Sequence, residues 1–173
     1  TTGYEEAAAQ GLVAGLNAGR RAGGSSAYHF SRSTSYIGVM IDDLTSRGVT
    51  EPYRMFTSRA EYRLSLRADN ADVRLTPEAM SLNLVGSARA ERFGEYLEEL
   101  SVWREKLRLL SMTPTEAEAR GLKVNKDGQR RTAFELLGYP DVDVGSLQGS
   151  WPELADVSPR VAEALEIEAG YSV

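Results

Sequence analysis

The 173-residue sequence contains no cysteine and only one histidine, His29. The lack of cysteine excludes disulfide bonds, thiolate metal sites and a cysteine nucleophile within this chain. A serine–histidine–aspartate triad would depend on His29 alone, and no Gly-x-Ser-x-Gly motif accompanies it. There is no run of eighteen apolar residues and no basic-then-apolar N-terminal pattern, so the sequence predicts neither a membrane span nor a secretory signal.

Acidic side chains are concentrated in the second part of the chain. Residues 1–75 carry nine basic and eight acidic side chains, a net charge of +1, whereas residues 76–173 carry eleven basic and seventeen acidic ones, a net charge of −6. Since a negative surface repels a polyanion, we expect any contact with nucleic acid to involve the first part or segments outside this sequence. The length suits one domain or somewhat more.

Residues 51–75, here called the arginine segment, contain five arginines and no lysine, and Arg47 precedes them. A guanidinium offers a planar fork of donors that binds phosphate or carboxylate through two bonds at a time. Arg59, Arg63 and Arg67 are four residues apart, an interval that keeps side chains on one face of either a helix or a strand. The sequence therefore predicts a one-sided row of arginines.

The local structure and the role of this segment each admit two interpretations. The pattern of a capping box in residues 58–61 favours a helix, whereas the alternation of Tyr62, Leu64 and Leu66 with polar residues is typical of a strand. We prefer the helix. Six acidic residues lie in or beside the segment, so a structural network of salt bridges is the alternative to phosphate binding.

Hydrophobic periodicity predicts helices along most of the chain and no strand-rich region. In the first part we expect a helix capped by Thr1 or Thr2 that ends near Gly19–Gly24, and a second over Tyr36–Arg47 that stops at Gly48. Asp42 and Asp43 fall on this second helix, and we expect them to pair with nearby arginines rather than to bind a cation.

In the second part the motif Thr76-Pro77-Glu78 predicts the start of a short helix that closes at Gly86. The longest helix is expected over residues 88–110, a capping box at Thr132 opens a later one, and Ser158-Pro159 opens a last helix still running at Val173. Four apolar positions of the longest helix are predicted to be buried: Phe93, Leu97, Leu100 and Leu107.

Several long blocks of the sequence are similar to one known family. They are TTGYEEAAAQGLVAGLNA at residues 1–18, YIGVMIDDL at 36–44, EPYRMFTSRAEYRL at 51–64 and DNAD at 69–72. These blocks resemble the glucose-inhibited division protein A family, the flavin subunit of the bacterial enzyme that places carboxymethylaminomethyl or aminomethyl groups on the wobble uridine of certain tRNAs. The resemblance is specific up to residue 76 and general over the helical remainder.

The resemblance implies a mainly α fold in which the end of a Rossmann-type FAD domain is followed by an all-helical C-terminal domain. The boundaries it implies are residues 1–75 for the first, with its arginine-rich segment facing tRNA, and 76–173 for the second, truncated at its C-terminus. The family's Gly-x-Gly-x-x-Gly segment and catalytic cysteines have no counterpart here. The chain is therefore expected to be a C-terminal fragment with no catalytic residue of its own.

The resemblance also implies two sets of binding residues. Backbone N–H groups at the start of the first helix would face the pyrimidine edge of the FAD isoalloxazine, where a helix N-terminus stabilises negative charge. The residues expected at that position are Thr1, Thr2, Gly3 and Tyr4. The residues expected to hold the tRNA anticodon stem-loop at the mouth of the flavin pocket are Arg54, Arg59, Arg63 and Arg67.

In this family a one-carbon unit from methylenetetrahydrofolate and an amine are joined to uridine C5, with FAD and NADH as redox partners. The resemblance implies a cytoplasmic homodimeric enzyme that works with tRNA and a GTPase subunit. Two alternatives remain open. One is the related folate- and FAD-dependent tRNA uracil methyltransferase, against which the long helical region argues. The other is a helical interaction or tRNA-binding module without chemistry of its own.

Overall fold

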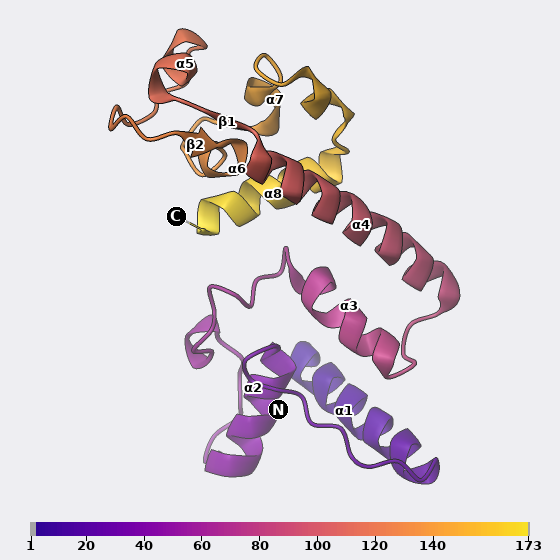
Figure 1. Ribbon diagram of the computed structural model, residues 1–173. Helices are drawn as coiled ribbons and strands as arrows, with labels where there is room; N and C mark the ends of the chain where they lie inside the picture. The colour runs from indigo at the N-terminus through magenta and orange to yellow at the C-terminus, as the bar shows by residue number, and fades with distance from the viewer. Residues whose placement is uncertain (1–2, 173) are drawn as a thin grey trace. The chain divides into compact units, whose positions relative to one another are not determined.

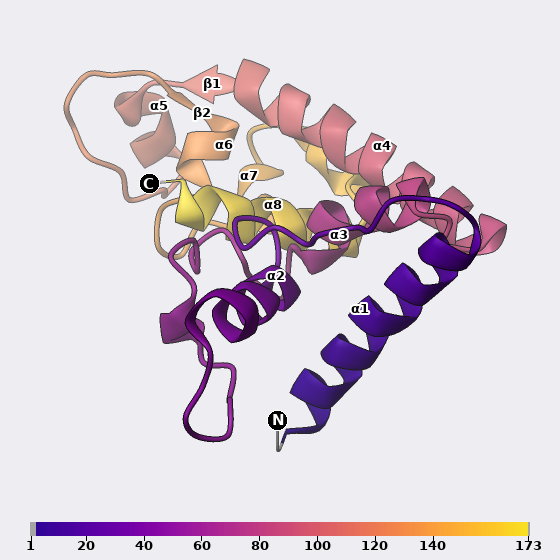
Figure 2. The ribbon, with the colours of Figure 1, turned by 90° about the horizontal axis from the view of Figure 1, so that it is seen from below.

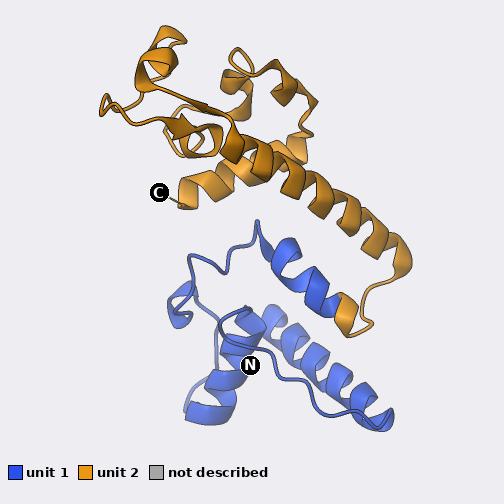
Figure 3. Cartoon of the chain, viewed as in Figure 1, with its two compact units in different colours: residues 1–79 blue, residues 80–173 orange. Residues whose placement is uncertain are grey.

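Helices make up most of the described chain, which covers residues 3–172 of the computed structural model (Figure 1). The prediction of a mainly helical fold is confirmed. Within the described residues, regular β-structure is limited to one antiparallel pair of two-residue strands. The chain divides into two compact units, residues 1–79 and 80–173, and the division falls within one helix (Figure 3). No helix in the described range is long and apolar enough to cross a lipid bilayer.

The first unit begins with helix α1, Tyr4–Ala22, which ends at Gly23 as the sequence predicts. Acidic side chains in its first turn and basic ones in its last turn both suit the helix dipole. The following segment turns at the end of α1 and leads to α2 (Figures 1 and 2). Asn17 fixes it, because the side-chain amide donates to the carbonyl of Tyr28 at 3.1 Å and accepts the Tyr28 N–H at 2.7 Å.

The predicted second helix is present as α2, Tyr36–Asp42, extended by a π-helical turn over Asp43–Arg47. Ser35 caps it, since its hydroxyl accepts the Gly38 N–H at 3.0 Å. Gly48 ends the turn with φ of 67°, a conformation that glycine adopts without a steric penalty.

Close backbone packing places the segment before α2 against its first turn. A side chain at Gly38 would overlap the backbone of Ser31 and Arg32. Only glycine allows this approach, and the approach brings Arg32 beside the acidic residues of α2 and the turn that follows it.

The predicted helix in the arginine segment is wrong, and so is the strand alternative. Only Thr57–Arg59 is helical, as a single 3-10 turn, and Ala60 follows it in an extended conformation. Residues 61–65 form turns. Ala60 and Leu66 are both buried against Val39 of α2. Burying two side chains six positions apart requires the chain to turn between them, so tertiary packing overrides the local pattern.

The prediction that a helix starts at Thr76 is also wrong, because helix α3 spans Ala71–Ser81 and contains Pro77 in its interior. Proline lacks the N–H that would bond to the preceding turn. Two contacts support the first turns, namely the Arg74 N–H to the Asn70 carbonyl at 3.1 Å and the Thr76 hydroxyl to Asp72 at 2.6 Å. The helix is followed by Asn83 with φ of 57°, so Gly86 does not close it.

The second unit is built from short elements around one long helix, α4, Ser87–Leu109, for which Gly86 is the N-cap. The remaining elements are β1 Ser111–Met112, α5 Pro114–Ala119, β2 Arg131–Thr132, α6 Ala133–Leu136, α7 Val144–Leu147, a 3-10 helix over Pro152–Asp156, and α8 Pro159–Tyr171. The predicted capping box at Thr132 is present, and Thr113 forms another.

Helix α4 packs against α6 and α8 to form the core of this unit. Arg104 of α4 donates two hydrogen bonds, of 2.9 and 2.7 Å, to Glu168 of α8. The core residues of α4 are Phe93, Leu100, Trp103 and Leu107, which confirms three of the four predicted buried positions.

Two expectations about this unit are corrected. Leu97 is 36% exposed, because it lies beside the buried stripe of α4 rather than on it. Helix α8 ends at Tyr171, with Ser172 as its C-cap, so it is not still running at the end of the described residues.

Replacing Leu100 with alanine should lower the free energy of unfolding of the second unit by about 2–5 kcal/mol, because Leu100 is buried in its core. Leu109→Ala on the same helix is the control: Leu109 is 81% exposed, and the change should cost under about 0.5 kcal/mol. Both tryptophans, Trp103 and Trp151, lie in this unit, so their fluorescence during urea denaturation reports on it alone. Equal losses for the two variants would contradict the core assignment.

Candidate nucleic-acid interface

The start of α1 is the position where the resemblance implies a flavin contact. Thr1 and Thr2 lie outside the described residues. Gly3 is the N-cap of α1, in an extended conformation and without a side-chain cap. The Tyr4 side chain is 94% exposed. The first turn of α1 therefore offers backbone N–H groups that no capping side chain occupies, which suits an acceptor group placed at the helix end.

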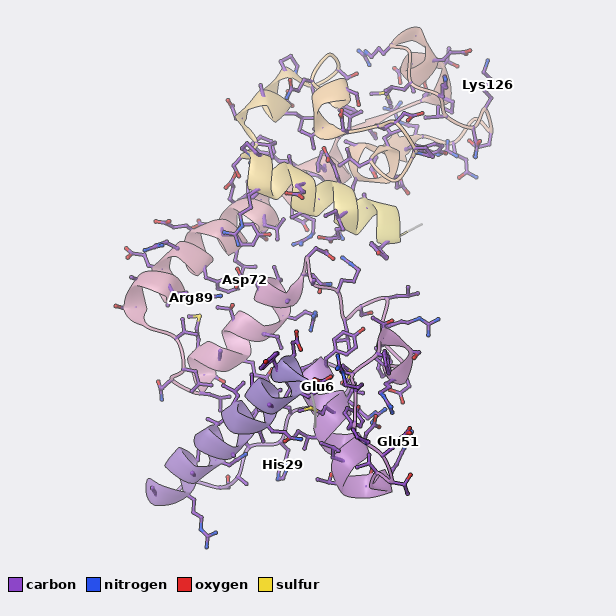
Figure 4. All side chains as sticks on the ribbon, turned by 180° about the vertical axis from the view of Figure 1, so that it is seen from behind. Glu6, His29, Glu51, Asp72, Arg89 and Lys126 are labelled. Atoms are coloured by element: carbon purple, nitrogen blue, oxygen red, sulfur yellow. The ribbon has the colours of Figure 1, made fainter. Side chains whose placement is uncertain are left out.

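Glu6 is a buried carboxylate in the first turn of α1 that sequence reasoning missed (Figure 4). It is 4% exposed, and its Oε1 accepts the Met55 N–H at 2.9 Å and lies 3.4 Å from Nε of Arg54. The Met55 hydrogen bond is the main cause that holds the pKa of Glu6 below its ordinary value. The carboxylate therefore fastens the arginine segment to the beginning of α1.

The second oxygen of Glu6 has an unusual environment. Oε2 is buried and has no hydrogen-bond partner among the described residues. It lies against Gly3, where any side chain would overlap it. A side chain at position 3 would therefore displace the Glu6 carboxylate from its present place.

A cavity of about 190 Å³ adjoins this carboxylate between α1 and α2. Its lining is mostly apolar and consists of Glu5, Glu6, Ala9, Tyr36, Ile37, Met40 and Met55. The cavity belongs wholly to the first unit and opens beside the uncapped start of α1.

Arg32 is the centre of an ion-pair cluster that holds the arginine segment in place. Its guanidinium lies 2.6 Å from Asp42, 2.9 Å from Asp43 and 2.7 Å from Glu61. Hydrogen bonds from Arg32 are the leading cause that lowers the pKa of Glu61. The expectation that the two aspartates pair with arginine is confirmed, although the partner lies outside the arginine segment.

Asp43 is nearly fully buried and links Arg32 to Tyr53. Burial alone would raise the pKa of Asp43, but hydrogen bonds from Arg32 and from the Tyr53 hydroxyl, at 2.9 Å each, outweigh it and the pKa is lowered. Tyr53 is buried as well, and burial together with the Asp43 bond raises its pKa to about 12. The phenol therefore stays protonated and donates to an ionised Asp43 at neutral pH.

The four arginines predicted to contact tRNA have different surroundings. Arg67 is committed internally, since it binds Asp69 with both Nε and Nη2 and donates to the Leu64 carbonyl at 3.0 Å. Arg54 is half exposed and shares Glu6 with the Met55 amide.

Arg59 and Arg63 are the other two. Arg59 lies 4.5 Å above the Tyr53 ring, and its Nε donates to the Arg54 carbonyl at 2.7 Å. Arg63 is exposed and forms no hydrogen bond or ion pair with any described residue.

These surroundings do not support the predicted one-sided row of arginines. Because the segment is neither helix nor strand, an interval of four residues does not by itself place the side chains on one face. Internal salt bridges, the alternative to phosphate binding, are present at Arg67 and, in part, at Arg54. They do not involve Arg63, which has no acidic partner in the described chain.

Two family models match the chain at opposite ends. The model described as the tRNA modifying enzyme MnmG/GidA C-terminal helical domain matches residues 87–173, and the model described as glucose inhibited division protein A matches residues 1–26. The chain belongs to the MnmG/GidA family. Its fold is the end of the FAD domain followed by the C-terminal helical domain of that family, as the resemblance implied.

Relatives of known name or structure agree along nearly the whole chain. The tRNA uridine 5-carboxymethylaminomethyl modification enzyme MnmG of Granulibacter bethesdensis is 48% identical over 172 residues, 99% of this chain and 27% of that protein. Two crystal forms of Aquifex aeolicus GidA superpose with TM-scores of 0.85 and 0.82 at 38% and 37% identity, each over 99% of this chain and about a quarter of that one. The chain thus spans about a quarter of the length of these MnmG/GidA proteins.

Replacing Asp43 with asparagine should destabilise the first unit by about 1.5–3 kcal/mol at neutral pH, because a buried charged hydrogen-bond acceptor is lost. Asp42→Asn is the matched control, since this neighbouring acid also binds Arg32 but is half exposed, and it should cost under about 1 kcal/mol. Thermal unfolding followed by far-UV circular dichroism measures both.

The difference between the two variants should depend on pH. The folded pKa of Asp43 is lowered, so its stabilisation is present above the unfolded pKa of about 3.9 and is lost as pH falls through the folded value. The disadvantage of Asp43→Asn relative to wild type should therefore shrink below about pH 4. A disadvantage that stays constant from pH 7 to pH 3 would contradict the ionised, paired state of Asp43.

Proposed function

We propose that this chain is the C-terminal part of an FAD-dependent enzyme that adds a (carboxymethyl)aminomethyl group to C5 of the tRNA wobble uridine. The observation that carries the proposal is 48% identity to a protein of that name over 99% of the chain. The first unit helps hold tRNA beside the flavin, and the second unit provides a helical surface for tRNA or the GTPase partner. The assembly is a cytoplasmic homodimer.

The start of α1 fits one edge of FAD. The N-cap residue of α1 makes no side-chain cap, and an apolar cavity adjoins its first turn. Gly3 and Tyr4, with Thr1 and Thr2 before them, would hold the pyrimidine edge of the isoalloxazine, where the helix N-terminus favours negative charge. When bound, FAD supplies the electrons for the reaction that joins the one-carbon unit of methylenetetrahydrofolate to uridine, with NADH as the reductant.

The arginine segment fits a polyanion because part of its charge is not compensated internally. Arg63 has no partner in the described chain, and the guanidinium of Arg59 donates only through Nε, to a backbone carbonyl. Arg54 is half exposed beside Glu6. These groups would bind tRNA phosphates near the flavin, while Arg67 keeps the segment folded through Asp69.

The match of residues 87–173 to the MnmG/GidA helical-domain model favours this function over that of the related uracil methyltransferase. The isolated chain should itself behave as a tRNA-binding module without catalytic activity. The sequence holds neither cysteine nor a diphosphate-binding glycine loop, and the rest of the flavin site would lie elsewhere in the enzyme.

The isolated chain should show no stoichiometric binding of FAD, because it supplies one wall of the site and no diphosphate loop. Titration of FAD with flavin fluorescence as the signal tests this, and the intact protein is the positive control. Micromolar binding with a 1:1 stoichiometry would show that the site lies within this chain.

Arg63→Ala in the intact protein should weaken tRNA binding and reduce the dependence of log K on log salt by roughly 0.7–0.9 units, the value for one phosphate contact. Its melting temperature should not change, because Arg63 has no partner among the residues that the structure describes. Arg67→Ala is the matched control and should lower the melting temperature, since it strands Asp69. An Arg63→Ala variant with a wild-type salt dependence would remove Arg63 from the tRNA interface.

A further inference from the structure

Phe56 is an exposed aromatic side chain among the arginines of the arginine segment. It is 58% exposed and is one of four phenylalanines in the chain. An exposed aromatic ring offers a flat apolar face on which a ligand ring can stack. Arginines 54, 59 and 63 surround it in sequence, which makes a polyanionic ligand with an apolar component the best chemical match.

The local backbone brings the Phe56 ring and one guanidinium together. Phe56 is the N-cap of the 3-10 turn Thr57–Arg59, and its carbonyl accepts the Arg59 N–H at 3.0 Å. This bond closes a tight turn between the two residues. The Arg59 guanidinium accordingly lies 6.0 Å from the centre of the Phe56 ring.

The Arg59 guanidinium, which lies beside Phe56, is held in place by other residues of the first unit. Arg59 lies 4.5 Å over the ring of Tyr53, and the Tyr53 hydroxyl is fixed by Asp43, which Arg32 holds in turn. The Arg59 Nε is also bonded to a backbone carbonyl. The Arg59 guanidinium is therefore positioned before any ligand arrives, which lowers the ordering cost of binding.

A flat ring next to a flat cation is the surface on which unpaired nucleobases stack. Every base has a π-face, and proteins that hold single-stranded RNA use phenylalanine rings and arginine planes for this contact. A protein partner would also cover an apolar ring, but it would not need an uncompensated cation such as Arg63 in the same segment. The charge of the segment therefore favours RNA.

We propose that Phe56 and Arg59 form a stacking platform for an unpaired nucleobase of the tRNA, beside the arginines that bind its phosphates. The inference rests on the proposed function, and it adds that the site selects single-stranded over paired RNA. Tyr62, 55% exposed in the same segment, is a second aromatic group on which a neighbouring base can stack.

The test uses the intact protein and two RNAs of equal length and charge, an anticodon stem-loop and a fully paired duplex. Phe56→Leu keeps an apolar side chain but removes the flat ring, and Phe56→Tyr keeps the ring. Phe56→Leu should bind the stem-loop about tenfold more weakly, as the loss of one stacked base predicts, and the duplex with unchanged affinity. Phe56→Tyr should bind both as wild type does.

Two further readouts separate stacking from phosphate binding. The salt dependence of stem-loop binding should be unchanged in Phe56→Leu, because no ion contact is lost. A 2-aminopurine placed at an unpaired loop position should lose fluorescence on binding to wild type and less so on binding to Phe56→Leu. Arg63→Ala should instead weaken the binding of both RNAs and reduce the salt dependence of that binding.

Three outcomes would overturn the inference. They are unchanged stem-loop affinity in Phe56→Leu, equal losses for stem-loop and duplex, and a lower melting temperature with wild-type affinity, which would mean that another part of the enzyme covers Phe56. If Arg63→Ala also leaves both RNAs unaffected, the proposed tRNA contact of this segment fails as well. If Arg63→Ala behaves as expected and Phe56→Leu does not, only the stacking platform is lost.

Discussion

The buried charge of Asp43 is the constraint on which the first unit depends. A carboxylate at 5% exposure is stable only if donors replace the water it has lost. Arg32 reaches it because Gly38 lets the preceding backbone lie against α2, and Tyr53 reaches it from the arginine segment. Arg32 also binds Glu61, so two parts of that segment are fixed by the same guanidinium.

This arrangement divides the arginines by task. Arg32 and Arg67 neutralise acids within the unit and keep an irregular segment in one conformation. The charge of Arg63 is uncompensated in the described chain, and the Arg59 guanidinium packs on the Tyr53 ring. A segment without regular secondary structure can thus present cations at fixed positions, because side-chain contacts replace the backbone ladder of a helix or strand.

The helices could be predicted from the sequence because their signals are local. The stripe of α4 and the capping box at Thr132 depend on residues three or four positions apart. Pro77 misled the prediction, since proline is common at a first helical position but here lies inside α3. Nothing local distinguishes the two cases.

The candidate site was less predictable because its contacts join distant residues. Arg32 and Glu61 are 29 positions apart, and Glu6 and Met55 are 49 apart, so no spacing rule pairs them. The abundance of arginine predicted an anion site, and that prediction does not depend on the local geometry. Only the structure shows which arginines remain available and that Phe56 lies beside one of them.

The bond between Glu6 and Met55 has a consequence for the order in which the protein is made. The start of α1 leaves the ribosome 49 residues ahead of the Met55 amide that anchors it. Until then the Glu6 carboxylate lacks the hydrogen bond that fastens the arginine segment to the start of α1. The end of the helix that faces the proposed flavin site is therefore completed late in synthesis, after the arginine segment has emerged.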